Sequence, residues 1–235
     1  MTPSFDAVLF DLDGTLVDSA PDLRAALNEL LAGYDLPPVP LDAVKGMIGH
    51  GVRKLVERAF VHVGHPLDEA ALDEEHERML PIYERNLTGL TTAMPGTLEA
   101  MRALKNEGAK LAVVTNKPAQ FTQAVLEHYG FLPLLDFWIG GDGGVAKKPA
   151  PDMLLRAVER LGSRPARAVM VGDSSADVIS AHAGAIKAVI VEGGYTPEGA
   201  GNLGADAVIA TMHELPGALS DLAQVNTDTD AMSLP

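Results

Sequence analysis

Two acidic residues, Asp11 and Asp13, directly follow the short apolar run Ala7–Phe10. This run predicts a buried strand that opens into a tight loop at Gly14. Because side chains alternate along extended backbone, Asp11 and Asp13 can face one side while Leu12 enters the core. Two carboxylates about 4 Å apart repel by roughly 4 kcal/mol at an effective dielectric of about 20, so we expect a cation to offset them. The alternative is an ordinary acidic loop.

Other polar residues follow later predicted strands. They are Thr115 and Asn116, then Lys148, then Asp173 and Asp177. In a parallel sheet such positions meet at one edge, where ligands bind. The set then combines a nucleophile, an acid, a hydroxyl, an amide, an ammonium and metal-binding carboxylates. A carboxylate that attacks a phosphate dianion is repelled, and a hard cation with a lysine can offset that repulsion. The combination predicts phosphoryl transfer.

The elements that would position these groups alternate along the chain from residue 94 onward. The pattern predicts strands at 110–114, 137–139, 168–171, 188–191 and 207–209, with helices at 97–106, 119–129, 151–161 and up to 183. Strands that alternate with helices predict an α/β fold with a doubly wound parallel sheet, similar to a Rossmann core. We assign residues 1–16 and 91–223 to this core.

The segment from residue 17 to 90 has a different pattern. It predicts helices from about 20 to 31, from 41 to 63, from 68 to 79 and near 81–87, without a strand. We therefore expect an inserted, all-helical domain. The final residues, 224–235, are rich in Asn, Thr, Asp and Ser, and we predict that this tail is disordered.

Composition narrows the function further. The 235 residues carry a formal charge of −14, which disfavours binding to nucleic acid or to an anionic membrane surface. The chain has no cysteine, so a bound metal is expected to be hard and oxygen-bound, which favours Mg²⁺ over Zn²⁺. No membrane-spanning run or signal peptide is evident, and a cytoplasmic location is expected.

The ordered motifs Asp11-Leu12-Asp13-Gly14-Thr15, Thr115, Lys148-Pro149 and Gly172–Asp177 resemble the four motifs of the haloacid dehalogenase superfamily. The likeness runs from the first strand to about residue 210, and the helical insertion is placed like that family's first type of cap. It implies that Asp11 attacks phosphorus to form an aspartyl phosphate. Asp13 would protonate the leaving oxygen and then activate water.

The same resemblance implies roles for the remaining motif residues. Thr115 and Lys148 would hold the phosphoryl group, and Lys148 is preferred over Lys147 because the family's lysine directly precedes the proline. Mg²⁺ would be bound by three groups, with Asp177 completing or supporting the set. These three are Asp11, the backbone carbonyl of Asp13, and Asp173. Family members that act as dehalogenases typically lack an acid at the position of Asp13, so its presence favours phosphatase or phosphomutase chemistry.

Substrate preference is expected to depend on the cap stretch 48–59, which contains His50 and Arg53. This stretch resembles the cap loop of bacterial phosphoglycolate phosphatases, which implies hydrolysis of 2-phosphoglycolate to glycolate and phosphate. His50, Arg53 and Asn116 are then candidate substrate-binding residues, and Arg53 could pair with the substrate carboxylate. The alternative for Arg53 is a solvated helix residue.

Several alternatives stay open from the sequence. The substrate could be a sugar phosphate or pyrophosphate, or the enzyme could be a phosphomutase resembling the one that acts on β-glucose phosphate. A non-catalytic phosphate-binding module is disfavoured because none of the motif residues is missing. The expected partner is a small phosphorylated metabolite, and the chain is expected to be a monomer or a homodimer.

Overall fold

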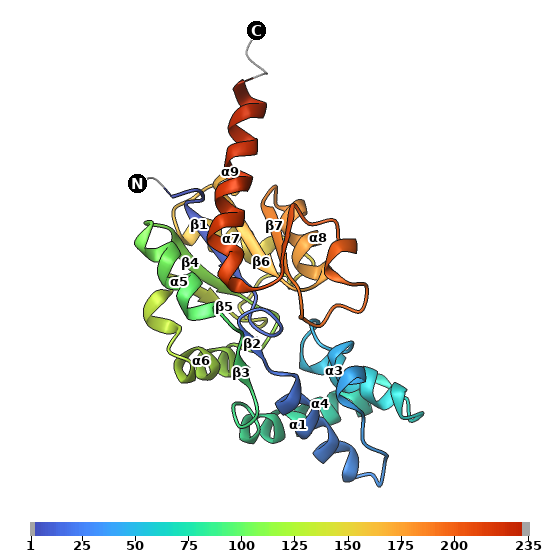
Figure 1. Ribbon diagram of the computed structural model, residues 1–235. Coiled ribbons are helices and arrows are strands. Elements are labelled where there is room, and N and C mark those ends of the chain that lie inside the picture. Colours follow the sequence, from blue (N-terminus) through green and yellow to red (C-terminus); the bar gives the residue numbers. More distant parts are fainter. Residues whose placement is uncertain (1–2, 232–235) are drawn as a thin grey trace.

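The computed structural model describes residues 3–231, with side chains described up to residue 224. A parallel six-stranded sheet in the order β5-β4-β1-β6-β7-β8 forms the core (Figure 1). Its strands are β1 (Ala7–Phe10), β4 (Lys110–Val114), β5 (Phe137–Ile139), β6 (Ala168–Gly172), β7 (Lys187–Val191) and β8 (Ala207–Ile209). The predicted α/β class is confirmed.

Strand β1 lies at the centre of the sheet, where its four residues are fully buried. Its apolar side chains alternate between two cores, as strand geometry requires. Val8 and Phe10 join the core beneath α5 (Thr97–Asn106) and α9 (Leu215–Ala231). Ala7 and Leu9 join the core beneath α7 (Asp152–Arg160) and α8 (Ser175–Ala183). The remaining core elements are α6 (Ala119–His128) and the 3₁₀ turns Leu132–Leu134, Pro165–Arg167, Ala200–Asn202 and Met212–Glu214.

Four helices form the cap, which lies below the sheet in Figure 1. They are α1 (Ala20–Ala32), α2 (Leu41–Lys45), α3 (Val52–His62) and α4 (Glu69–Arg85). The helix predicted over 41–63 is two helices, because Gly51 adopts a φ of 86° that helical residues do not adopt. Conversely, α4 continues through exposed Pro81, where a break was predicted. The missing hydrogen bond of this proline therefore lies on the water-facing side.

The two chain segments that connect the core to the cap run side by side. The segments β2 (Val17–Asp18) and β3 (Thr92–Ala93) pair antiparallel, and the sequence pattern did not predict either of them. Next to this ribbon, the buried Asp22 carboxylate in the first turn of α1 accepts hydrogen bonds from the backbone of Leu90 and Thr91 at 2.7–3.0 Å. It also accepts one from the Thr91 hydroxyl at 2.7 Å. Asp22 thus joins the outgoing and returning chain segments.

Replacing Asp22 tests this junction. Asp22→Ala leaves the Thr91 amide buried without its acceptor and leaves the Thr91 hydroxyl only the Leu87 carbonyl at 3.4 Å, and we expect it to lower the free energy of unfolding by about 2–4 kcal/mol. Asp22→Asn keeps one acceptor oxygen and should lose less. Urea unfolding of both variants measures the difference, and equal stability of Asp22→Ala and the parent protein would contradict the assignment.

Helix α9 closes the described chain. It continues to Ala231, so residues 224–231 are helical where the composition predicts disorder, while 232–235 lie outside the described residues. Within residues 3–231, no helix has both the length and the apolar character needed to cross a bilayer.

Candidate active site

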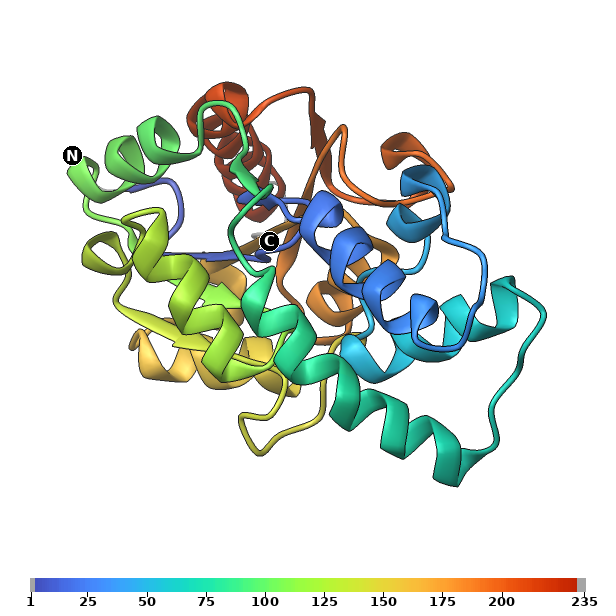
Figure 2. The ribbon, with the colours of Figure 1, turned by 90° about the horizontal axis from the view of Figure 1, so that it is seen from below.

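The carboxyl ends of β1, β4 and β6 bring the predicted motif residues to one edge of the sheet. The register pairs Phe10 at the end of β1 with Val113 of β4 and Val171 of β6, so the three loops that follow start level with one another. The cap covers this edge and faces the viewer in Figure 2. The site therefore lies between the sheet and the cap.

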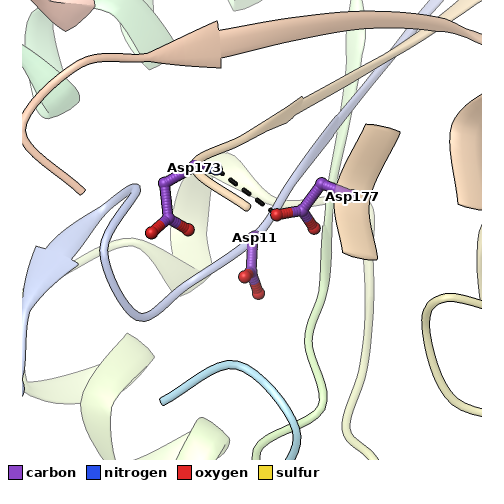
Figure 3. Close-up of side chains that lie close together, drawn as sticks. All are labelled: Asp11, Asp173 and Asp177. Atoms are coloured by element: carbon purple, nitrogen blue, oxygen red, sulfur yellow. Dashed lines mark hydrogen bonds between the residues drawn. The ribbon is translucent and has the colours of Figure 1, made fainter. Parts of the chain in front are cut away.

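Three carboxylates gather at this edge. Asp11, Asp173 and Asp177 can each offer one oxygen within 4.8 Å of the others, and all three residues are buried (Figure 3). Lys148 Nζ lies 3.0 Å from an Asp11 oxygen and 2.6 Å from an Asp177 oxygen. Burial raises the pKa of Asp11 to about 6, against the opposing effect of Lys148, and burial together with Asp177 raises the pKa of Asp173. One ammonium therefore leaves the cluster short of positive charge.

The donor set of this cluster fits a hard divalent cation. Although Asp11 Oδ1 lies 3.0 Å from Lys148 Nζ, it accepts no well-aligned hydrogen bond from the described part of the chain. Asp173 accepts from the Tyr195 amide at 2.7 Å and from the Thr15 hydroxyl at 3.3 Å, which leaves lone pairs available. Buried carboxylate oxygens with free lone pairs are the ligands that Mg²⁺ and Ca²⁺ prefer. Asp11 and Asp173 are therefore the residues placed to bind such an ion.

Asp177 is more fully occupied than these two acids. One of its oxygens accepts from Lys148, and the other accepts from the Ser174 hydroxyl at 2.7 Å and from two backbone amides. The bond from the Ser174 amide belongs to a capping box at the start of α8, in which the Ser174 side chain in turn accepts from the Asp177 amide. The sequence left two alternatives for Asp177, direct metal ligation or support of the other ligands. These contacts favour the supporting role.

Gly14 makes room for the Asp173 carboxylate. Its φ is 86°, and a Cβ at this position would lie 2.4 Å from Asp173 Oδ2. Both its backbone conformation and the close approach therefore require glycine. This explains in physical terms why a glycine follows Asp13 in the first loop.

Asp13 occupies a separate, partly exposed position on the cap side of the cluster. Its Oδ1 accepts a hydrogen bond from the Ser19 hydroxyl at 2.6 Å and from Lys117 Nζ at 2.9 Å. Lys117 Nζ also lies 3.2 Å from the other oxygen of Asp13 and donates to the Tyr83 hydroxyl of cap helix α4. Asp11 and Asp13 thus have different partners, as expected for a nucleophile and an acid–base group.

Lys117 is a site residue that our sequence reasoning missed. It is 4% exposed. Burial alone lowers its pKa, but Asp13 and Tyr83 outweigh that effect and raise the pKa, so the side chain is an ammonium. The signal was its position directly after Thr115 and Asn116 at a strand end. The sequence did not indicate Tyr83, because this residue lies far from Lys117 along the chain and no local pattern predicts their contact.

The predicted residues Thr115 and Asn116 both lie at the site but face different groups. Thr115 lines the cavity with Asp11. The Asn116 amide group donates to the backbone carbonyls of Gly49 and Lys148 and accepts from the Lys148 amide. Asn116 therefore ties the lysine loop to the cap loop, and it is better placed to hold the loops than to bind substrate.

The cavity between sheet and cap has at most about 430 Å³ of empty space. Its polar wall is formed by core residues and its apolar wall by the cap. The core residues are Asp11, Asp13, Thr115, Asn116 and Lys117, and the cap residues include Leu23, Ile48, Val52, Leu55 and Tyr83. Among the described residues, Lys117 is the one cationic side chain that lines this cavity.

Neither cap candidate from the sequence lines this cavity. The Arg53 guanidinium pairs with Glu69 at 2.6 Å and with Asp73 at 2.8 Å, both on the cap. His50 lines a second hollow with Arg58, beside Asp13 and Asp173. The structure therefore places Arg53 in the cap's own ion-pair network and places His50 at an approach to the site.

Tyr195 also belongs to the site, where it contacts both Asp173 and the chain segment that leads into the cap. Its amide donates to Asp173, and its hydroxyl donates to Asp18 at 2.7 Å. The same hydroxyl accepts from the Ala20 amide at 3.0 Å. Tyr195 thus contacts both Asp173 of the carboxylate cluster and the start of the cap.

Metal binding should stabilise the fold in a pH-dependent way. Without metal, the folded-state pKa of Asp11 is about 6 against an ordinary value of 3.8, so the folded state binds more protons than the unfolded state in this range. Its stability contribution therefore falls as pH rises between about 4 and 6. We expect Mg²⁺ to raise the Tm more at neutral pH than at about pH 5, because it binds the ionised carboxylates. Thermal melts with Mg²⁺ and with EDTA measure this, and a Tm independent of Mg²⁺ would contradict the site.

Comparison of the sequence with known protein families is consistent with the geometry of the site. A family model described as haloacid dehalogenase-like hydrolase matches residues 5–184. The chain belongs to this family of hydrolases, and the resemblance noted from its motifs is confirmed.

Two relatives and one solved structure are similar to the chain over most of its length. The chain is 41% identical over 211 residues to a phosphoglycolate phosphatase from Caulobacter vibrioides, covering 90% of this chain and 89% of that protein. It is also 41% identical over 207 residues to one from Rhodospirillum rubrum, covering 86% of each. A crystal structure of a predicted phosphoglycolate phosphatase from Haemophilus somnus superposes with a TM-score of 0.87 at 29% identity, covering 93% of this chain and 99% of the other.

Proposed function

We propose that this protein is a Mg²⁺-dependent phosphatase that hydrolyses 2-phosphoglycolate to glycolate and phosphate through an aspartyl-phosphate intermediate. The observation that supports this proposal most is that the two acids at the end of β1 contact different groups. Asp11 lies in the buried metal-binding cluster, whereas Asp13 is held on the cap side by Ser19 and Lys117. The choice of 2-phosphoglycolate as substrate is based on the phosphoglycolate phosphatases from Caulobacter vibrioides and Rhodospirillum rubrum, to which the chain is similar.

In the first step, an Asp11 carboxylate oxygen attacks phosphorus and the bond between phosphorus and the ester oxygen breaks. Asp13, protonated at that moment, gives its proton to the departing glycolate oxygen. Lys148 and Thr115 bind the phosphoryl oxygens. Bound Mg²⁺, held by Asp11 and Asp173, would supply positive charge to the phosphoryl group.

In the second step, water attacks phosphorus and releases Asp11 as a carboxylate. Asp13, now a carboxylate, takes the proton from that water. The cap excludes bulk water while the mixed anhydride exists, and Asn116 holds the cap loop against the lysine loop through Gly49. The limited, half-apolar cavity suits a leaving group as small as glycolate.

A substrate panel tests the proposal. Phosphate release is measured with 2-phosphoglycolate, hexose phosphates and pyrophosphate, each with Mg²⁺ and with EDTA. We expect the highest kcat/KM for 2-phosphoglycolate and no turnover in EDTA. A preference for a hexose phosphate or pyrophosphate would overturn the substrate assignment, and sugar-phosphate isomerisation without phosphate release would indicate a mutase.

A further inference from the structure

Lys117 stands out among the residues of the cavity because it is a buried cation whose use the hydrolysis mechanism does not require. Lys148 already serves the phosphoryl side, where it lies 3.0 Å from Asp11. Lys117 lies instead beside Asp13, which faces the leaving group. A buried ammonium is costly unless it is paired, and Lys117 is paired with Asp13 and Tyr83 while it also lines the cavity.

The chemistry of the substrate places a second anion at this end. In 2-phosphoglycolate one carbon separates the ester oxygen from the carboxylate. Asp13 must approach that ester oxygen to protonate it, so a cation 2.9 Å from Asp13 is also close to the carboxylate. An ammonium has three N–H donors, which can be shared between Asp13, Tyr83 and an entering anion.

The cap completes this position from the other side. Tyr83 brings a hydroxyl to Lys117 from α4, and its ring lies 4.8 Å from the ammonium. The start of α3 also lines the cavity, at its N-cap Gly51 and its first residue Val52, and no side chain among the described residues caps it. The positive end of α3 therefore adds to the charge of Lys117.

We infer that Lys117, with Tyr83, is the subsite that recognises the substrate's carboxylate and so determines preference for a phosphorylated hydroxy acid. This inference rests on the proposed function and makes it specific. It replaces Arg53, whose guanidinium pairs with Glu69 and Asp73 away from the cavity lining. It also couples recognition to cap closure, because the lysine comes from the core and the tyrosine from the cap.

The test compares 2-phosphoglycolate with 2-hydroxyethyl phosphate, in which a hydroxymethyl group replaces the carboxylate. The readout is the ratio of the two kcat/KM values. Because Lys117 also contacts Asp13, its replacement should lower both activities, and the ratio isolates carboxylate recognition. We expect the parent protein to favour 2-phosphoglycolate by on the order of 100-fold, and Lys117→Met to reduce that preference to less than about threefold.

Further variants keep the test decisive. Tyr83→Phe removes one hydroxyl from a packed ring and should reduce the ratio by about three- to tenfold, even if Lys117→Met folds poorly. Lys54→Met is the matched control, because Lys54 is exposed on α3 and paired with Glu57, and it should keep the parent ratio. A parent-like ratio in both Lys117→Met and Tyr83→Phe, or a collapse in Arg53→Ala instead, would overturn the inference. A parent protein without preference for 2-phosphoglycolate would refute the proposed function itself.

Discussion

Asp11→Asn is expected to lower kcat for Mg²⁺-dependent phosphate release by at least about 10⁴-fold, because the amide cannot act as the nucleophile. The substitution keeps the size of the side chain and removes one of three buried carboxylates. The Tm in EDTA should therefore not fall, since the repulsion among the three buried carboxylates is reduced. Steady-state kinetics and thermal melts on the same preparation separate lost chemistry from lost folding.

The matched control for this prediction is Asp42→Asn, which makes the same chemical change at an exposed position on α2. It should keep parent activity. Near-normal turnover by Asp11→Asn would refute the covalent mechanism. An inactive but unfolded Asp11→Asn would show instead that the carboxylate is needed for the fold, which the charge balance of the cluster argues against.

Lys148→Met should have the second-largest effect, and it should affect both activity and stability. The substitution removes the ammonium that lies 3.0 Å from Asp11 and 2.6 Å from Asp177, while both carboxylates stay buried. Breaking a buried ion pair from one side costs about 3–5 kcal/mol, so the Tm in EDTA should fall clearly. Loss of the phosphoryl-binding cation should lower kcat/KM by about 10³-fold.

Mg²⁺ separates the two consequences of this variant. It should restore much of the lost Tm, because it supplies positive charge to the same carboxylates, but it should not restore turnover. Lys147→Met is the matched control, since Lys147 is the adjacent, exposed lysine. If Lys147→Met were the inactive variant and Lys148→Met the active one, the assignment of the motif lysine would be wrong.

The core fold was predictable because its signals are local. Helix 97–106 and strands 110–114, 137–139 and 207–209 have the bounds that the sequence pattern predicts. Each is a short periodic segment ended by glycine or by polar residues. The general geometry of parallel sheets then predicted that the motif residues at the strand ends lie close together, without knowledge of any side-chain contact.

The parts that sequence reasoning missed depend on contacts between distant segments. The β2–β3 ribbon has two residues in each strand, too few for a periodic signal, and exists only because the two segments that connect the core to the cap meet. Likewise, Lys117 gains meaning from Tyr83 on a cap helix. Arg53 was a reasonable candidate by charge, but Glu69 and Asp73, one turn apart on α4, pair with it. Such pairings follow from how helices dock and not from local patterns.

The central place of β1 has a consequence for how the chain matures. Strand β1 is synthesised before both of its neighbours in the sheet, which begin at Lys110 and Ala168. Its four apolar residues therefore have no partner strand until β4 has been synthesised. Such non-local pairing slows folding and exposes strand edges to aggregation. A newborn chain should thus need shielding until β6 emerges, and we expect no hydrolytic activity before Asp173, which directly follows β6, is in place.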